Sequence, residues 1–272
     1  MISIFKKSRY ALIGVLITAC HPQLAPLNTS ESIVIDGEDT EWNRDQYQKV
    51  SGLGLVYSIA QEEQYIKILV KAMDQQTFKK IGLLGLTIWL DGTGKSKKEV
   101  GIKYPLGAME SGMLENMMSQ RGSLQNFDRE KLEGKGLEML EEKSSNEVGL
   151  IGILDDTKEL YHVTLEQLKI PIEISQKIVS RQEFIIEYSV PNSLLKKGKK
   201  DFIAIGFEIE GINVQELIKK QMAGRGGGRF AGVAGGRMTG RSMGMGGMND
   251  KLRAFQELNQ PVMTWSKFQW NE

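Results

Sequence analysis

The sequence predicts a mainly β protein, an antiparallel β-sandwich that carries a helical insertion and a glycine-rich loop. First, apolar segments of strand length recur along the chain, with turn residues such as Asp91-Gly92 between them. Second, residues 65–73 alternate strictly, with Ile66, Ile68, Val70 and Ala72 on one purely aliphatic side, as in a half-buried strand. Third, helical periodicity appears in only two or three places, whereas a parallel α/β sheet needs helices between its strands. The chain's 272 residues are enough to bury a core without disulfides.

The first nineteen residues predict a lipoprotein signal peptide. Lys6, Lys7 and Arg9 form a basic start, and an apolar run over residues 10–18 follows that is short for a membrane-spanning helix. The run ends in Ile17-Thr18-Ala19-Cys20, which resembles a bacterial lipobox, and Cys20 is the only cysteine of the chain. We therefore expect cleavage before Cys20, acylation of its thiol and a location on the bacterial envelope, most naturally the outer membrane; a simple membrane anchor with a chance cysteine is the alternative.

The mature chain is predicted to begin with a tether, and residues 33–272 are predicted to form one domain. The tether is residues 20–32, which are polar and contain two prolines. Ile33-Val34-Ile35 reads as an entering strand, Asp36-Gly37 as a turn and Trp42 as an anchor in a core. Removing the signal peptide leaves 32 basic and 34 acidic side chains, so no global charge indicates nucleic-acid binding.

The remaining elements follow from local patterns in chain order. After the opening segment, residues 53–60 and 65–73 read as strands; residues 74–76 end the second strand, and residues 77–82 read as a polar connection. A near-continuous apolar run at 83–90, the turn at 91–95 and residues 99–104 predict a hairpin. Methionines and leucines at spacings near three and four predict the helical insertion at about 107–146. Further strands are expected at 148–154, 160–165, 184–190, 202–209 and 262–270, with a helix at 249–258.

Residues 224–247 differ in composition from the rest of the chain. Eleven of these 24 residues are glycine, four are arginine and none is acidic. Ordering such a segment is entropically costly, so the composition predicts a flexible basic loop inserted into the fold. The loop could approach anionic lipid, lipopolysaccharide or an acidic partner, and a solvated spacer without a partner is an equal alternative.

Four motifs occur in the order found in carbohydrate-binding module family 9-like domains of the DOMON-like β-sandwich group. The chain has the opening Ile35-Asp36-Gly37 with Glu41-Trp42, a strand such as 65–74, the hairpin Ile88-Trp89-Leu90-Asp91 with Gly94, and Glu187 followed by Val190-Pro191. Over residues 31–105 and 148–209 the chain resembles those domains, and with its lipobox it looks like exported lipoproteins of the Bacteroidetes type. The resemblance implies a sandwich fold and a glycan-binding role.

The sequence contains no recognisable catalytic or metal-binding constellation. His162 is the only histidine beyond the tether, whereas a zinc site usually needs several nitrogen or sulfur ligands and a serine hydrolase needs a base beside its nucleophile. Asp36, Glu38 and Asp39 could bind calcium but do not match an EF-hand loop, so a structural turn is the preferred interpretation. We expect a non-enzymatic protein without metal or cofactor; haem held by His162 and a methionine is a remote alternative.

Tryptophans are the natural candidates for stacking on a sugar. Trp42 and Trp89 are expected in the core, because one lies in the anchor motif and the other in an apolar strand. Trp265 and Trp270 lie five residues apart on the last strand and would face opposite sides, so both are candidate ligand-binding residues. The sequence thus favours a membrane-anchored, non-catalytic protein that binds a glycan or an envelope protein. An assembly factor acting through residues 224–247 and a haem-binding redox protein remain as alternatives.

Overall fold

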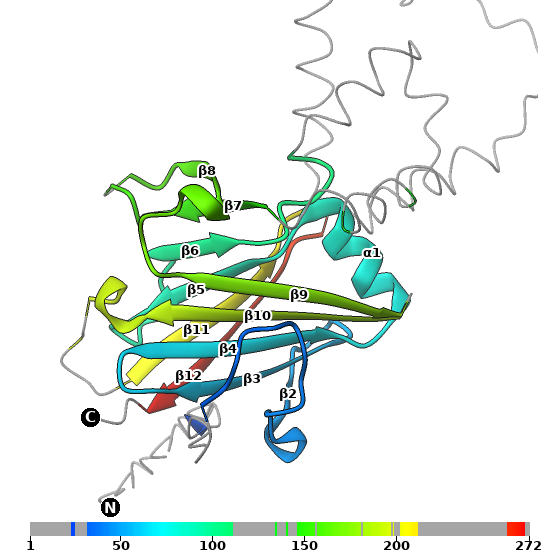
Figure 1. The fold of residues 1–272 in the computed structure, drawn as a ribbon, viewed down its shortest axis with the longest axis horizontal. Coiled ribbons are helices and arrows are strands. Elements are labelled where there is room, and N and C mark those ends of the chain that lie inside the picture. The colour runs from blue at the N-terminus through cyan, green and yellow to red at the C-terminus, as the bar shows by residue number, and fades with distance from the viewer. Residues whose placement is uncertain are drawn as a thin grey trace, which may run out of the picture.

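The computed structural model describes residues 23–24, 32–110, 134, 140, 146–155, 157–180, 182–196, 198, 202–211 and 260–269. These residues form two β-sheets packed face to face, with one α-helix at an end of the sandwich (Figure 1). The mainly β fold class expected from the sequence is confirmed. The signal peptide, nearly all of the tether, residues 224–247 and the expected helix 249–258 lie outside the described residues, as does most of the expected insertion at 107–146.

The larger sheet has seven strands. Their spatial order is β1 (Gln23–Leu24), β12 (Val262–Gln269), β11 (Phe202–Ile209), β5 (Thr87–Asp91), β6 (Val100–Lys103), β7 (Glu147–Ile151) and β8 (Leu160–Thr164). Neighbouring strands run antiparallel except for the parallel pair β1 and β12. The last strand of the described chain thus pairs with residues 23–24, which belong to the predicted tether.

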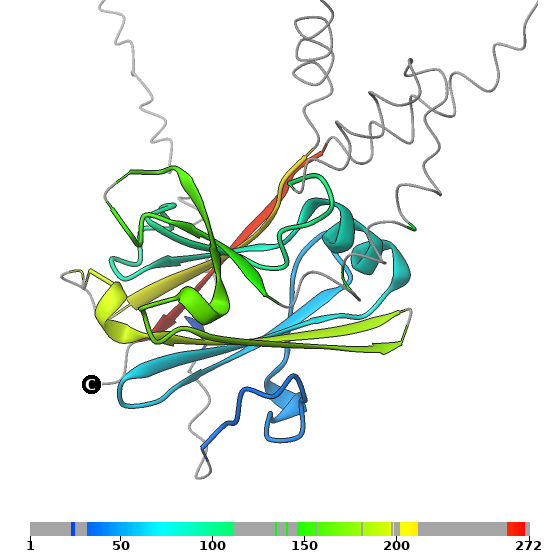
Figure 2. The same ribbon diagram turned by 45° about the horizontal axis from the view of Figure 1, so that its top comes forward.

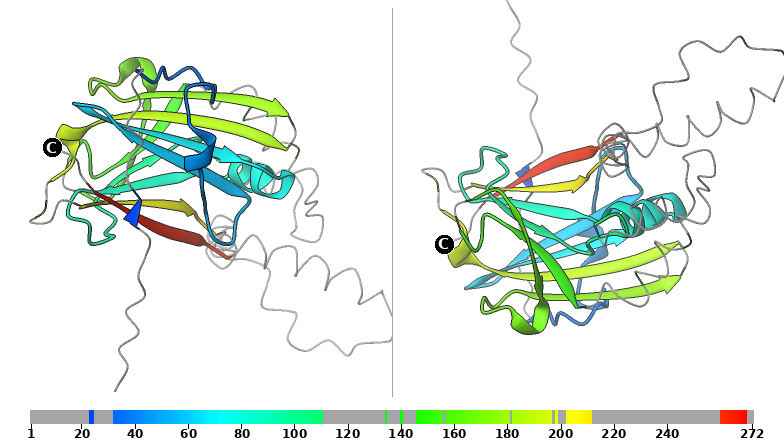
Figure 3. Two further views of the ribbon diagram at one scale, coloured as in Figure 1. Left: turned by 90° about the horizontal axis from the view of Figure 1, so that it is seen from below. Right: turned by 90° about the horizontal axis from the view of Figure 1, so that it is seen from above.

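The smaller sheet has five strands, all antiparallel to their neighbours. Their order is β2 (Gln48–Lys49), β3 (Leu55–Gln61), β4 (Tyr65–Ala72), β10 (Glu183–Pro191) and β9 (Glu173–Ser180). The alternation noted at residues 65–73 puts Ile66, Ile68 and Val70 into the core between the sheets. Figure 3 shows the two layers edge-on, with the core between them.

Helix α1 (Gln75–Leu84) closes one end of the sandwich, where the sequence predicted only a polar connection. Asp74 caps its start by accepting a hydrogen bond from the Thr77 N–H at 2.7 Å, and Gly85 ends it with a φ of 79°. The helix takes the first residues of the apolar run at 83–90, so β5 begins only at Thr87. Its apolar side adds Phe78, Ile81, Leu83 and Leu84 to the core.

The opening segment is not the strand that the sequence predicted. Residues 32–35 join no sheet and instead cross the outward face of the five-stranded sheet, on the side away from the larger sheet (Figure 2). Their polar groups bind side chains: the Ile33 N–H donates to Glu62, and the Ile33 carbonyl accepts from Lys67. Ile33 and Trp42 are buried there against Ala60, Leu69 and Ile185, in a small cluster separate from the main core.

Short 3₁₀ helices complete the described structure. They are η1 (Arg44–Gln46), η3 (Leu165–Gln167) and η4 (Asn192–Leu194). Among the residues that the structure describes, no helix is long and apolar enough to cross a membrane.

Candidate functional site

The face of the seven-stranded sheet that points away from the core is called here the outer face, and a row of indoles and glycines crosses it. Strand pairing sets Trp265, Gly206, Trp89 and Gly101 side by side on β12, β11, β5 and β6. Their strand neighbours, such as Ile88 and Phe207, fill the core, so these four positions point outward. Trp89 is therefore buried, as expected, but it lies outside the sandwich core.

Each glycine leaves the space that an indole ring occupies. A Cβ on Gly206 would lie 3.0 Å from Cδ2 of Trp265, and a Cβ on Gly101 would lie 2.8 Å from Cζ3 of Trp89. Any larger residue at these two positions would push the rings away from the sheet. The row Trp265–Gly206–Trp89–Gly101 is called the indole row below.

Glu208 fixes Trp89 of the indole row from the next outward position of β11. Trp89 Nε1 donates to Glu208 Oε2 at 2.6 Å, and Lys98 Nζ donates to Oε1 of the same carboxylate at 2.6 Å. The Lys98 ammonium also lies 5.3 Å from the centre of the Trp89 ring. Glu208 is 7% exposed and Trp89 is 6% exposed, so both groups are almost fully withdrawn from water. The cluster therefore combines a buried carboxylate, a buried ring and one ammonium.

A second charged group lies beside this cluster on the outer face. Lys103 pairs with Glu110 at 2.6 Å and with Glu210 at 3.1 Å, although its own side chain is only 3% exposed. Thr87, which is buried, lies between Lys103 and Glu208 in the strand register. The outer face thus offers hydrogen-bonding groups of both charges next to the indole row.

Of the two candidate tryptophans of the last strand, the structure describes Trp265 but not Trp270. Trp265 is half-buried on the outer face. Trp270 lies outside the described residues. Of the described tryptophans, only Trp265 has a ring that a ligand could reach without rearrangement, because Trp42 and Trp89 are buried.

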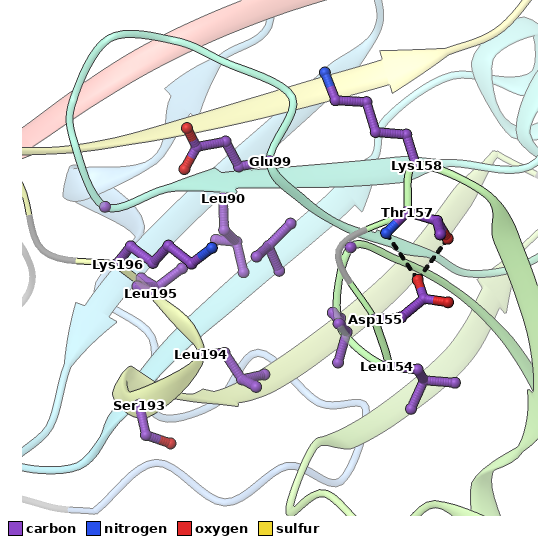
Figure 4. Close-up of a pocket in the computed structure, with 14 residues that line it drawn as sticks. Leu90, Glu99, Leu154, Asp155, Thr157, Lys158, Ser193, Leu194, Leu195 and Lys196 are labelled. Atoms are coloured by element: carbon purple, nitrogen blue, oxygen red, sulfur yellow. Dashed lines mark hydrogen bonds between the residues drawn. The ribbon is translucent and has the colours of Figure 1, made fainter.

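A cleft of about 540 Å³ opens at the end of the sandwich opposite α1 (Figure 4). Its walls come from the β5–β6 turn, the β7–β8 turn and η4, and its apolar floor includes Leu90, Val100, Ile153, Leu194 and Leu195. Glu99, Lys158 and Lys196 stand at its rim. The volume is that of an ordinary small-molecule site, but no aromatic side chain is among its described lining residues.

Asp155 organises one wall of this cleft. Its carboxylate accepts from the Thr157 N–H at 2.9 Å, from the Thr157 hydroxyl and from the Tyr161 hydroxyl at 2.6 Å. The hydrogen bonds from Thr157 and Tyr161 hold the pKa of Asp155 below its usual value, so it is a carboxylate at neutral pH. Figure 4 shows that Thr157 and Asp155 are turned toward each other, which fixes the turn rather than presenting a free acid.

On the other sheet, Glu187 explains why two of the sequence motifs occur together. Its Oε1 accepts from Trp42 Nε1 at 2.6 Å, and its Oε2 accepts from the backbone N–H groups of Asp36 at 3.0 Å and Gly37 at 2.7 Å. The opening motif and the Glu187–Pro191 motif are therefore two halves of one contact, called here the Glu187 clasp. Burial raises the pKa of Glu187, and these hydrogen bonds offset the effect only in part.

Asp91 of the hairpin motif, like Glu187, has a structural role. It is fully buried and accepts from the Thr93 N–H and hydroxyl and from the N–H groups of Lys95 and Lys97, at 2.6–2.9 Å. Burial would raise its pKa, but these hydrogen bonds outweigh burial and hold the pKa below the usual value. Asp91 therefore shapes the turn that delivers Lys98 to Glu208.

The remaining candidates from the sequence do not form a site. His162 is exposed on β8, and the described residues contain no group of three side chains that could hold a metal. Asp36, Glu38 and Asp39 do not converge: Asp36 accepts from the Glu38 N–H, Glu38 pairs with Lys177, and Asp39 pairs with Lys71. Cys20 and residues 224–247 lie outside the described residues.

Sequence reasoning missed Glu208, Lys98 and Glu187 as site-forming residues. The available signal was a single glutamate at an outward position in each of two otherwise apolar strands, 202–209 and 184–190. Each glutamate meets an indole that lies more than 100 residues away in the sequence, which no local pattern reveals.

Two solved structures similar to this chain are carbohydrate-binding modules. One is a carbohydrate binding module family 9 from Caldicellulosiruptor kristjanssonii in complex with glucose, 11% identical, with a TM-score of 0.31 and coverage of 71% of this chain and 80% of that chain. The other is a module of the same family and organism in complex with cellotriose, 12% identical, with a TM-score of 0.30 and coverage of 69% and 75%. No protein-family model and no curated protein matches the sequence. The sandwich itself is established by the two packed sheets described above.

Proposed function

We propose that this protein is a non-catalytic lipoprotein of the bacterial envelope, anchored through Cys20, whose outer face binds a glycan. The observation that carries the proposal is Trp265, which is half-buried over Gly206 on the outer face, whereas Trp42 and Trp89 are buried. A flat aromatic ring with polar neighbours suits a sugar, because a sugar ring has an apolar face and a rim of hydroxyl groups. The Glu208–Lys98 ion pair provides polar groups next to the indole row.

The end cleft is a less suitable site for a sugar. Its apolar floor consists of leucine, isoleucine and valine side chains, which offer no flat surface for stacking. The outer face, in contrast, combines an accessible indole with charged hydrogen-bonding groups. We therefore assign glycan binding to the outer face and assign no catalytic residue.

Replacing Trp265 by alanine is expected to weaken glycan binding about thirtyfold, equivalent to about 2 kcal/mol for truncating a central aromatic contact. Because Trp265 packs on the sheet surface rather than in the core, the variant should keep its fold. The measurement is a glycan array on the full chain carrying Cys20→Ser, followed by calorimetry on the best oligosaccharide. Val179→Ala is the matched control, because it removes an exposed apolar side chain from β9 of the other sheet. Equal affinities for W265A and V179A would refute the assignment to this face.

Replacing Cys20 by serine is expected to abolish lipidation of the protein, because a hydroxyl cannot replace the lipidated thiol. Multiple acyl chains on one residue would anchor the chain stably, since each buried methylene contributes about 0.8 kcal/mol. The measurement is incorporation of labelled palmitate together with cell fractionation. Incorporation of palmitate into the Cys20→Ser variant would refute lipidation at Cys20.

A further inference from the structure

The carboxylate of Glu208 and the ring of Trp89 form a cation site that the protein fills with its own lysine. The Lys98 ammonium lies 2.6 Å from Glu208 Oε1 and 5.3 Å from the centre of the Trp89 ring. The second carboxylate oxygen, Oε2, accepts from Trp89 Nε1, which fixes the carboxylate against the ring. A full negative charge and an aromatic face together favour an ammonium group over a neutral donor.

Glu208 and Trp89, which form the cation site, belong to the sheet, whereas Lys98, which fills the site, does not. Glu208 and Trp89 stand on the central strands β11 and β5 and are almost fully buried. Lys98 comes from the turn between β5 and β6, and its side chain is 45% exposed. By comparison, Lys67, Lys71 and Lys103, which stand on strands and pair with carboxylates, are at most 9% exposed, whereas Lys177 on β9 is 49% exposed. Because Lys98 comes from a turn and is partly exposed, it can return to water without opening the sheet.

When Lys98 leaves, the surroundings favour another cation. Glu208 then lacks its ion-pair partner, and a buried carboxylate without a counter-charge is strongly unfavourable. Glu110 and Glu210 lie on the same face, and Lys103 is the basic group that pairs with both. Within this group of side chains, three carboxylates then face the ammonium of Lys103, while Lys267 stands on the same face on β12.

We propose that an ammonium group of the ligand displaces Lys98 and binds between Glu208 and Trp89 while the body of the ligand stacks on Trp265. This inference rests on the proposed glycan function and narrows its ligand to a saccharide with a free, unacylated amino group. Lys98 then competes with the ligand for the site. The apparent affinity for the ligand is lowered by the fraction of molecules in which Lys98 occupies the site, called here the closed state.

The test compares two trisaccharides that differ only in acylation, tri-glucosamine and tri-N-acetylglucosamine, on the full chain carrying Cys20→Ser. Lys98→Met removes the competing ammonium but keeps the length of the side chain, and it is expected to tighten tri-glucosamine binding about tenfold. Lys95→Met, which removes a lysine from the same turn, should leave the affinity unchanged. Glu208→Gln in the Lys98→Met background should abolish the preference for the free amine. Binding is measured by calorimetry and by the NMR shift of the Trp89 indole N–H, which reports on its bond to Glu208.

The outcomes separate this inference from the proposed function. Equal affinities for the two trisaccharides in the Lys98→Met variant would overturn the ammonium site and leave glycan binding intact. As a probe that does not depend on oligosaccharide binding, glucosamine and N-acetylglucosamine are titrated into the same variant while the Trp89 N–H is observed. A shift with glucosamine alone supports the ammonium site even if no oligosaccharide binds. If glucosamine causes no shift of the Trp89 N–H, the ammonium site is refuted, regardless of the result for Glu208→Gln.

Discussion

Glu187→Ala is expected to lower the free energy of unfolding by about 3–5 kcal/mol, the cost of removing one partner from a buried charged contact. The variant leaves three donors without an acceptor: Trp42 Nε1 and the N–H groups of Asp36 and Gly37. Trp42 and Ile33 would then lose their fixed position over the five-stranded sheet, so apolar burial is lost as well. Urea unfolding should show the loss, and the melting temperature should fall by about 10 °C.

The matched control is Glu183→Ala, on the same strand and the same face. Glu183 pairs with Lys71 but is about one-third exposed, so its removal should cost about 1 kcal/mol or less. Hydrogen exchange should separate the two variants, since only Glu187→Ala should expose the Gly37 amide. If both variants were equally stable, the Glu187 clasp would contribute nothing to holding the opening segment.

The raised pKa of Glu187 gives this contact a definite pH dependence. A carboxyl group with a higher pKa in the folded state binds its proton more tightly there, so its contribution to stability is greatest below the unfolded pKa. That contribution declines as the pH rises through the folded pKa. Asp91 and Asp39, whose pKa values are lowered, contribute in the opposite sense and lose stability in acid. Glu187→Gln, which does not titrate, isolates the first effect when its stability is compared with that of the wild type between pH 4 and pH 7.

The sequence was sufficient to predict the sandwich because most of its strands carry a local signature. The alternation at residues 65–73 became β4, the turn residues at 91–95 became the β5–β6 connection, and the last apolar segment became β12. In each case one face of the strand packs on the core and the other does not. A period-two alternation of apolar residues indicates such a strand. β9 was missed because its inward positions include the polar Gln176, which breaks the apolar face.

Two predictions were wrong for the same physical reason. An apolar run of residues does not show against which surface of the protein those residues pack. Ile33 is buried and Ile35 is partly buried on the outward face of one sheet, while Val34 is exposed, so the apolar run 33–35 predicted a strand although the segment joins no sheet. Trp89 stands in an apolar run because its outward face is also withdrawn from water, so the pattern predicted a core residue. The candidate site was only partly predictable for the same reason. Trp265 was identifiable as an aromatic on a terminal strand, whereas its neighbours Glu208 and Lys98 are brought near it only by strand pairing.

Asp91→Ala is expected to lower the free energy of unfolding by about 3 kcal/mol and to detach Lys98 from Glu208. The buried carboxylate accepts four hydrogen bonds from Thr93, Lys95 and Lys97, and hydrogen bonds to a charged group contribute about 1.5–3 kcal/mol each. Water can replace part of them, because the turn residues 93–98 are partly or fully exposed, so the loss is smaller than the sum. Without this carboxylate the turn loses the contacts that set its path just before Lys98. The stability is measured by urea unfolding and the detachment by the NMR shift of the Trp89 indole N–H.

Asp91→Asn is the control that separates the charge from the shape of the turn. Its amide oxygen can still accept from Thr93, but its amide nitrogen faces the N–H groups of Lys95 and Lys97 without accepting from them. About half of the stability loss is therefore expected, with the Trp89 signal shifted in the same direction as in Asp91→Ala. If Asp91→Ala unfolds more easily but the Trp89 signal stays in place, the turn supports the fold without positioning Lys98. In that event Lys98 would find Glu208 through charge alone, and the closed state of the cation site would depend on salt concentration rather than on the geometry of the turn.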